Sequence, residues 1–533
     1  MRAANLVTYG LLISAVLAFA VIVWKYARGL KESPRDMWLL FGYKVIEYTA
    51  YAAMNMALVL WLSKDCGLGD VAAGSYISGW SIILSVMAMV AGALVDTIGV
   101  RKTIVVSVVF LLIARFFMAF VTSRFLIIPL GLMPLAIGFA IVGPVVSVAI
   151  KRYTTKAGSA LGFGLFYVVM NVAYAIGGWF FDFVREKYAL RDAAGKVIDE
   201  NAGTALFGHH FSTYQLFFVF GFGFTLVSLV VGAFLRDGVE MTEEGIVIRP
   251  PKQHASAFVA VKTAAVDTIK TIAGVMKERY FWIFIGMLAT TVFVRFIFFH
   301  FHYTFPKYGI RVLGEGAKIG SIYGVLNPVL IVFLVPLVAA FTKNVSSYRM
   351  MIFGSIVSSL SCFIATIPSK IFEPLTNSVL GELIFIKWLG MAPDMQALMA
   401  KPPTPDYWPL IAFILVFTVG EAIWSPRLMQ FTAEIAPKGK EGTYIALSVL
   451  PFFAAKFVVG PMSGLLVKTY TPLDAAGKAM ASYPNHHMVW IWIGGMAVVT
   501  PIGLVLLRKL FRSQEQGNQP APSDDEDGKP EAA

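Results

Sequence analysis

Seven charged side chains fall inside runs of apolar residues, and they are the first candidates for chemistry in this chain. They are Lys44, Glu47, Arg115, Arg295, Glu421, Arg427 and Lys456. Each costs about 3 kcal/mol to insert into hydrocarbon, so each is expected to face protein or a water-filled cavity. Charges in such positions usually mark the pathway of a solute or a proton.

Two of these charges are neighbours in sequence, and two come from separate runs. Lys44 and Glu47 lie one helical turn apart and could neutralise each other, either as a structural device or as part of proton-coupling machinery. An ion pair between Glu421 and Arg295 could open when a solute or a proton binds. Glu47 and Glu421 are therefore the candidate proton carriers, and Lys44 is grouped with them.

The remaining cations are harder to assign. Arg115 and Lys456 have no partner that the sequence reveals, and we expect structural roles, because long cationic chains often reach an interface or a backbone carbonyl. Arg427 follows Glu421 and could bind a substrate anion or pair with that carboxylate. Among the aromatic residues, Tyr51 and Tyr167 are candidates to line a cavity.

The composition shows what kind of scaffold positions these residues. Of 533 residues, 57% are hydrophobic and only 14% are charged, and the mean hydropathy is +0.71. That is more apolar surface than a soluble core can bury, so lipid must cover the rest. The net charge of +12 falls in short basic runs between apolar segments, which excludes a nucleic-acid-binding patch.

Thirteen apolar runs are long enough to span a bilayer. The first, about Asn5–Trp24, reads as a retained N-terminal anchor, and the others form two groups of six. The first group is Met37–Leu62, Gly74–Val95, Thr103–Val121, Leu126–Ile150, Ser159–Val184 and Gln215–Leu235. The second group is Phe281–Phe305, Ile319–Phe341, Met350–Ile367, Leu410–Thr432, Tyr444–Val467 and Met488–Leu507. The expected fold class is an all-α polytopic membrane protein.

These runs divide the chain into five parts. Residues 1–36 hold the anchor and a basic loop, 37–236 and 280–512 are the six-helix halves, 237–279 is a linker with a helix-like stretch at Ala255–Lys277, and 513–533 is a disordered acidic tail. Basic residues in the short loops place the linker and the tail in the cytoplasm and the start of the anchor outside. We expect a multi-pass protein of the cell membrane.

The loop after the second span of the first group combines a carboxylate, turn glycines and a basic pair. It reads Gly92-Ala-Leu-Val-Asp96-Thr-Ile-Gly99-Val-Arg101-Lys102. Asp96 can pair with Arg101 and form a latch that must break when two halves of a transporter rock. The loop resembles the signature loop of the major facilitator superfamily, which implies six plus six spanning helices with one extra helix here.

Several short segments, taken in order, resemble the proton-coupled oligopeptide transporters over about Met37–Leu507. They are Glu47-Tyr-Thr-Ala-Tyr51, Phe166-Tyr167-Val-Val-Met-Asn171, Asn327-Pro328 and Gly420-Glu421-Ala-Ile-Trp-Ser425-Pro426. The resemblance implies that Asn171, Asn327 and Glu421 hold the amino group of a peptide, and it strengthens the assignment of Tyr51 and Tyr167 to the cavity. We place Arg295 in the same substrate site because of its expected interaction with Glu421.

The match is incomplete where the family binds a peptide carboxylate and relays protons. Its helix-one pattern Glu-x-x-Glu-Arg is Lys44-Val-Ile-Glu47-Tyr48 here, so the first glutamate and the arginine are absent. A family lysine is replaced by Gly143, and a second family arginine aligns with Asn55. The proton-and-carboxylate site of the family is therefore only partly present.

The sequence has no nucleotide-binding loop, nucleophile elbow or metal-ligand motif, so we expect no enzymatic activity, cofactor or metal. The predicted function is a secondary transporter for short peptides or a related amine-bearing solute, coupled to protons. The expected partners are that solute, protons and the lipid bilayer, with the protein acting as a monomer and binding no nucleic acid. A facilitator or exporter of another small molecule, and a non-transporting nutrient receptor, remain alternatives.

Overall fold

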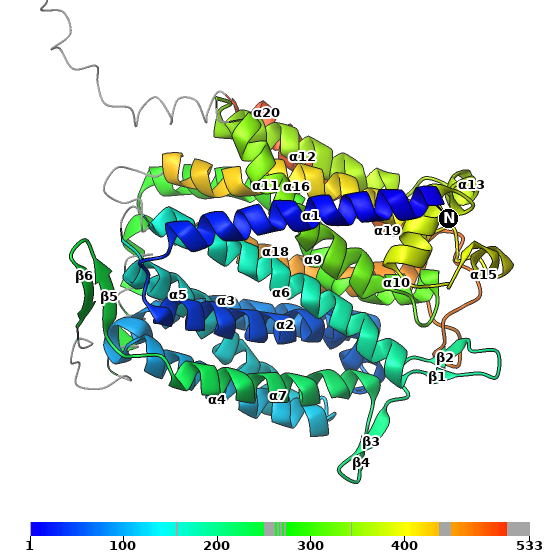
Figure 1. Ribbon diagram of the computed structural model, residues 1–533, viewed down its shortest axis with the longest axis horizontal. Coiled ribbons are helices and arrows are strands. Elements are labelled where there is room, and N and C mark those ends of the chain that lie inside the picture. Colours follow the sequence, from blue (N-terminus) through cyan, green and yellow to red (C-terminus); the bar gives the residue numbers. More distant parts are fainter. Residues whose placement is uncertain are drawn as a thin grey trace, which may run out of the picture.

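The computed structural model describes residues 2–155, 158–249, 273–342, 344–435 and 450–508, with scattered positions between 259 and 270 and at 448. Within that part of the chain, twelve helices are long and apolar enough to cross a membrane. They run roughly along one direction and form an elongated bundle (Figure 1). The prediction of an all-α polytopic membrane protein is confirmed.

The first half contains six spans, each formed by an apolar run whose backbone groups can find partners only within the helix in hydrocarbon. They are α2 (Arg35–Lys64), α3 (Asp70–Ile98), α4 (Val100–Phe120), η1 with α5 (Ile128–Leu132 and Met133–Tyr153), α6 (Ser159–Tyr188) and α7 (Thr213–Ala233). Each matches its predicted run to within about one turn of helix.

The second half repeats this number of spans. They are α9 (Arg279–Tyr303), η2 with α11 (Gly320–Val325 and Leu326–Phe341), α12 (Ser347–Ile364), α16 (Tyr407–Ile435), α18 (Leu450–Tyr470) and α19 with α20 (Met488–Ala497 and Val499–Leu506). The predicted start of the fifth run, Tyr444, lies outside the described residues. The predicted arrangement of six plus six is confirmed.

The predicted anchor falls within α1 (Arg2–Gly29), a separate helix on the outside of the bundle (Figure 1). Near its C-terminal end α1 lies against α6, where the Tyr26 hydroxyl approaches Gly164. It also contacts α14 (Val379–Gly381) and η4 (Glu382–Trp388), which belong to the second half. The extra helix thus touches both halves.

Short elements cap the two ends of the bundle. At one end, β1 (Leu190–Arg191) pairs with β2 (Val197–Asp199), and β3 (Thr204–Leu206) pairs with β4 (His209–Phe211), both antiparallel. The same end carries α10 (Phe305–Leu313), η3 (Ser369–Phe372), α13 (Glu373–Thr376) and α15 (Met395–Ala400). We call it the β1–β4 end, and the opposite end, which carries β5 and β6, the β5–β6 end (Figure 1).

The segment between the halves begins as a β-hairpin, which the sequence did not indicate. β5 (Val239–Thr242) pairs antiparallel with β6 (Gly245–Ile248). Most of the helix-like stretch Ala255–Lys277 and the whole tail 513–533 lie outside the described residues.

Glycines bring the two halves into close contact along two helix pairs. Gly178 on α6 lies against η2, where an added Cβ would be 2.7 Å from the carbonyl carbon of Gly324. Gly74 on α3 lies against α18, where an added Cβ would be 2.2 Å from the carbonyl oxygen of Gly460. Small residues of this kind allow helix backbones to approach in a membrane.

Candidate functional site

A buried ion pair joins α2 to α4 in the first half. Arg115 Nη1 lies 3.0 Å from Glu47 Oε2, and both side chains are 0% exposed. The same nitrogen donates to the carbonyl oxygen of Gly221 on α7 at 3.1 Å, so Arg115 ties three helices together. The sequence did not reveal this partner of Arg115, because Glu47 lies 68 positions away and on another helix.

The expected local pairing of Lys44 with Glu47 is also wrong. Lys44 Nζ lies 3.1 Å from the ring centroid of Tyr48 and 4.7 Å from that of Phe166, and it makes no hydrogen bond to any described residue. The ammonium is fully buried, and the ring faces supply its main electrostatic partners. Glu47 is turned toward Arg115 instead.

Tyrosines and other aromatic residues form a cluster beside this charged group. The Tyr51 ring is 5.8 Å from the Tyr48 ring, 6.1 Å from the Tyr174 ring and 4.6 Å from the Phe139 ring, measured between centroids. Tyr51 and Tyr174 are only partly buried, so this aromatic surface is not fully covered by protein. It is a surface against which an apolar or cationic solute could pack.

The second half holds a hydrogen-bonded carboxylate. Asn327 Nδ2 on α11 donates to Glu421 Oε2 on α16 at 2.7 Å and to the Thr418 hydroxyl at 3.0 Å. Glu421 and Asn327 are both buried, as expected for charged and amide groups that face protein. The sequence predicted both residues for one site, and the structure places them in direct contact.

Arg295 does not form the expected ion pair with Glu421. The described residues contain no contact within 4.0 Å between these two charges; the guanidinium instead lies 5.5 Å from the ring centroid of Trp424 and 5.1 Å from that of Phe452. Arg427 also leaves Glu421 unpaired, since it donates to Gln430 at 2.7 Å and to the Thr342 carbonyl at 3.3 Å. The rings that Arg295 faces lie on α16 and α18, and Arg427 bonds a residue of its own helix and the residue that follows α11.

Two predicted residues of the first half lie on α6, which faces the second half. Asn171 Nδ2 donates to the carbonyl oxygen of Tyr167 at 2.8 Å, so the amide lies along its own helix. The Tyr167 hydroxyl is within electrostatic range of both Glu421 and Arg295. Tyr167 of the first half therefore interacts electrostatically with Glu421 and Arg295 of the second, whereas Lys44 and Glu47 lie within the first half.

The loop of the predicted latch is a tight joint between α3 and α4. Gly99 has φ +85°, a conformation that glycine adopts without strain, and it separates the two helices by one residue. Arg101 and Lys102 are exposed. The side chain of Asp96 lies outside the described part of the structure, so its pairing with Arg101 remains a prediction, as does the part of Gly92 in the latch.

Ion pairs between the halves gather at the β1–β4 end. Asp70, the first residue of α3, accepts from Lys307 Nζ at 2.9 Å and from Arg311 Nη2 at 2.8 Å, both on α10. Burial lowers the pKa of Lys307 to about 8, against the attraction of Asp70. This triad fastens the start of α3 to the second half.

Two more pairs cross at the same end. Lys64 Nζ at the end of α2 lies 3.3 Å from Glu315 Oε1, and Lys318 pairs with Glu186. Burial, and then the negative charge of Glu200, raise the pKa of Glu315 despite the nearby Lys64. In the described part of the chain, every ion pair that joins the halves lies at the β1–β4 end.

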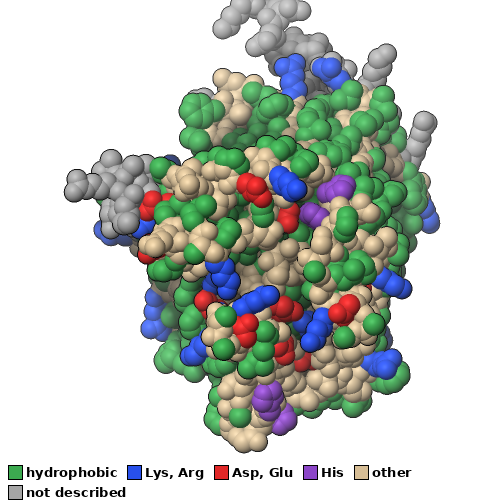
Figure 2. Space-filling model, turned by 90° about the vertical axis from the view of Figure 1, so that its right-hand side faces the viewer, with side chains coloured by type: hydrophobic (Ala, Val, Ile, Leu, Met, Phe, Trp, Pro, Cys, Tyr) green, Lys and Arg blue, Asp and Glu red, His purple; other side chains and the backbone are tan. Residues whose placement is uncertain are grey.

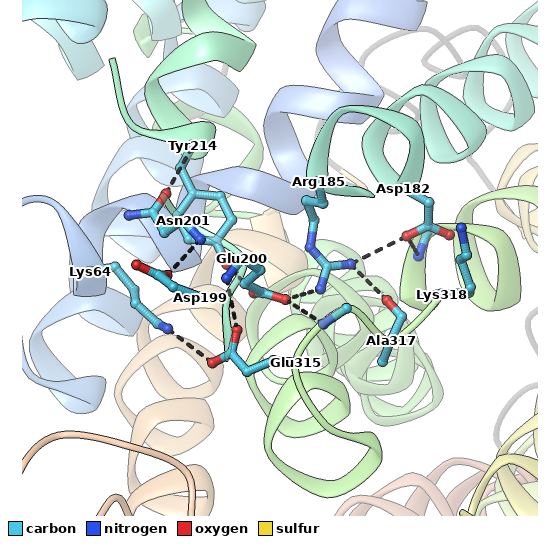
Figure 3. A network of polar contacts seen from close by, with 12 residues as sticks. Lys64, Asp182, Arg185, Asp199, Glu200, Asn201, Tyr214, Glu315, Ala317 and Lys318 are labelled. Atoms are coloured by element: carbon cyan, nitrogen blue, oxygen red, sulfur yellow. Dashed lines mark hydrogen bonds and ion pairs between the residues drawn. The ribbon is translucent and has the colours of Figure 1, made fainter. Parts of the chain in front are cut away.

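A buried network supports these crossings from within the first half (Figure 3). Arg185 on α6 pairs with Glu200 and lies 3.4 Å from Asp182, and Glu200 accepts a hydrogen bond from the Tyr214 hydroxyl. Arg185 also donates to the carbonyl oxygen of Ala317 in the second half at 2.8 Å. Burial opposes ionisation of Glu200, but Arg185 and the tyrosine hydroxyl outweigh it and hold the pKa of Glu200 below its usual value.

Sequence reasoning missed this end of the molecule. It searched for charges in the middle of the apolar runs, whereas these groups lie at helix ends and in loops. Figure 2 looks onto the β1–β4 end, where acidic and basic side chains gather across the middle of the face. Charged residues spaced three or four positions apart near the ends of predicted spans are the signal that could have indicated this end of the molecule. Examples are Asp182 with Arg185, and Lys307 with Arg311.

Comparison with known proteins agrees with this architecture. Residues 40–461 match the family model described as Major Facilitator Superfamily. No curated protein matches the chain.

Solved structures share the fold at low sequence identity. One is described as a POT family transporter in complex with 5-aminolevulinic acid, with 14% identity, a TM-score of 0.60, and coverage of 90% of this chain and 97% of the other. Another is peptide transporter POT in complex with sulfate, with 14% identity, a TM-score of 0.62, and coverage of 92% and 99%. A third is a bacterial homologue of the human drug peptide transporters PepT1 and PepT2, with 15% identity, a TM-score of 0.61, and coverage of 90% and 99%. Because the family model matches residues 40–461, which is most of this chain, and the described residues form twelve spans in two halves, this chain belongs to the Major Facilitator Superfamily.

Proposed function

We propose that this protein is a secondary transporter that takes up short peptides, or a related small solute bearing an amine, together with protons. Membership of the Major Facilitator Superfamily supports transport by alternating access. The likeness to structures described as peptide transporters supports the solute class. The observation that carries the proposal is the buried Glu421, which is bonded to Asn327 and within electrostatic range of Tyr167 in the other half.

The chemistry of this group suits an ammonium. An ammonium has three donors and no acceptor, so its binding site must offer oxygens. Glu421 offers a carboxylate, and Asn327, whose nitrogen is used in bonding Glu421 and Thr418, keeps its amide oxygen for a ligand. Because Tyr167 belongs to the other half, a solute held here would contact both halves and could sense their movement.

We propose Glu421 and Glu47 as the proton carriers, with Lys44 as an accessory cation. A proton on Glu47 would neutralise the carboxylate that pairs with Arg115 and would weaken the contact between α2 and α4. A proton on Glu421 would compete directly with the solute's ammonium. These two consequences could link proton binding to the release and resetting of the carrier.

The β1–β4 end is proposed to face the outside of the cell, with the linker and the C-terminal tail in the cytoplasm. The basic residues Arg101, Lys102, Lys151 and Arg152 at the opposite end support this orientation. The ion pairs between the halves would then close the outer side, so the described arrangement is the outward-closed state. We further propose that the protein acts as a monomer in the cell membrane.

The test is uptake of dialanine by purified protein in liposomes that contain a pH-sensitive dye. An inward proton gradient should drive uptake, and the peptide should acidify the lumen. Glu421→Gln should reduce uptake about tenfold or more, because a hydrogen bond to a charged group is lost. Glu373→Gln, which changes an exposed carboxylate on α13, is the matched control and should leave uptake unchanged. Uptake that ignores the pH gradient, with no effect of Glu47→Gln, would show that Glu47 does not couple transport to protons.

A facilitator or exporter of another small amine on the same fold is the second candidate. The observation that favours it is the fully buried pair of Glu47 with Arg115, which engages the carboxylate that proton coupling would need. Competition against labelled dialanine by amines without a peptide bond separates the two. Stronger competition by such amines than by unlabelled dipeptides would favour the second candidate.

A further inference from the structure

A cavity at the β1–β4 end lies between the halves, apart from the central residues discussed above. Its volume is about 350 Å³, within the range of sites that hold small ligands. Lys64 and Asp70 from the first half line it, together with Lys307, Arg311 and Glu315 from the second. Neutral residues at its rim include Leu473, which is exposed.

The charges that line this cavity do not balance. There are three cations, Lys64, Lys307 and Arg311, and two carboxylates, Asp70 and Glu315. Lys307 and Arg311 both converge on Asp70, and Lys307 is only 3% exposed. Two buried cations that share one carboxylate leave an excess positive charge, and such a site attracts an anion of small size.

We propose that this cavity is an entry site for a small solute that carries a carboxylate, such as an amino acid or a short peptide. The solute's carboxylate displaces Asp70 from Lys307 and Arg311. Where the solute also has an ammonium, that group displaces Lys64 from Glu315. The identity of the solute rests on the proposed function, whereas the site itself rests on the cavity and its charges.

Occupation of the site would weaken the closure of the outer end. The displaced contacts are three of the ion pairs that join the halves: Lys307 with Asp70, Arg311 with Asp70, and Lys64 with Glu315. The solute therefore replaces ion pairs between the halves with ion pairs between the solute and the protein. Because it binds the open state more tightly than the closed state, it drives opening. Binding of a solute at this site would then be coupled directly to opening of the carrier.

The test follows the chemical labelling of a cysteine at the rim of the cavity. Full-length protein with the buried Cys66 and Cys362 changed to alanine carries Leu473→Cys and is labelled in detergent with a maleimide. The probes are acetate, dialanine and dialaninamide, which lacks the carboxylate. Acetate and dialanine should slow labelling severalfold, and dialaninamide should not. A cysteine at the exposed Ala194, outside the cavity, should react at one rate throughout.

A matched pair of variants assigns any protection to the cavity. Lys307→Gln should raise the dialanine concentration that gives half-protection about tenfold, because one charge-assisted hydrogen bond is lost. Lys318→Gln removes another lysine that pairs across the halves but does not line the cavity, and it should leave that concentration unchanged. Equal protection by dialaninamide, absence of protection by the carboxylates, or an unaffected Lys307→Gln variant would each overturn the proposal.

The same material separates this site from the central one. Glu421→Gln should lose dialanine uptake and keep full protection of Leu473→Cys. Protection without uptake in the unmodified carrier would support the cavity and contradict the proposed function. Uptake without protection would support the proposed function and overturn the cavity.

Discussion

Two buried carboxylates at mid-depth, Glu47 and Glu421, are bonded within their own half, whereas two carboxylates at the β1–β4 end, Asp70 and Glu186, pair with cations of the opposite half. Arg115 bonds Glu47, and Asn327 bonds Glu421, each inside its own half. Asp70 and Glu186 pair with lysines or arginine of the opposite half. Contacts of the first kind survive a rocking motion of rigid halves, but contacts of the second kind must break.

This difference assigns two separate tasks to charged residues. Pairs inside a half hold helices together and set the stability of the fold. Pairs across the halves should set the balance between the described arrangement and one in which the halves have parted at the β1–β4 end. Substitutions should therefore divide into those that lower the unfolding temperature and those that move the conformational equilibrium.

The largest effect is expected at the buried pair of the first half. Glu47→Gln leaves Arg115 as an uncompensated buried charge, which should cost about 3–5 kcal/mol of unfolding free energy. Replacing both residues with leucine should recover most of that loss. Thermal unfolding of the purified variants measures both.

Lys44→Met is the matched control for that pair. It removes a fully buried cation that has no hydrogen-bond partner among the described residues, so stability should be unchanged or increased. A loss as large as that of Glu47→Gln would mean that Lys44, rather than Arg115, balances Glu47.

The next largest effect is expected at Asp70. Asp70→Asn removes the carboxylate that Lys307 and Arg311 share and should shift the equilibrium away from the closed state by about 2 kcal/mol. Distances between spin labels at Ala194 and Leu473, one in each half, report that shift. Glu186→Gln, whose side chain is 52% exposed, should move the same distances far less. Equal effects of the two variants would refute a special role for the Asp70 triad.

A steric change should act on the same equilibrium by another route. Gly178→Ala places a Cβ 2.7 Å from the backbone of Gly324, so the halves should separate there at a cost of about 1–2 kcal/mol to the closed state. Gly286→Ala on α9, where nothing lies within 4 Å of the added carbon, is the control. The same spin labels report the outcome, and unchanged distances in both variants would contradict it.

The smallest effect concerns pH. The pKa of Glu315 is raised in the closed state and should return to its ordinary value when the halves part and water reaches the carboxyl. The closed state then binds a proton more readily than the open state. Acidifying the outer side should therefore stabilise the closed state at pH values between the ordinary and the raised pKa of Glu315.

The size of this pH effect is limited. Glu315 is 24% exposed, and we expect less than about 1 kcal/mol. Glu315→Gln should abolish the dependence on pH, because it removes the titrating carboxyl. Opening upon acidification of the unmodified protein would show that loss of the Lys64 attraction outweighs the relief of burial.

The residues of the candidate site were predicted unevenly. Asn327 and Glu421 were assigned to one site from sequence, and they are in contact. The predicted partners of Glu47 and Arg295 were wrong, because the sequence shows which charges are buried but not which helix faces them. The cross-half triad at Asp70 was missed, since Asp70 lies 237 residues from Lys307 and 241 from Arg311 and all three are outside the middle of the apolar runs.

The sequence by itself determined the twelve spans of the bundle and their duplication into two halves. Hydrocarbon requires each crossing segment to be a long apolar helix, and that requirement is local and readable from composition. The tertiary structure alone decided which charges neutralise each other and at which end described ion pairs join the halves. Those outcomes depend on contacts between helices that are distant in sequence. The energy of an ion pair depends on the distance between its charges, and no local sequence pattern encodes that distance.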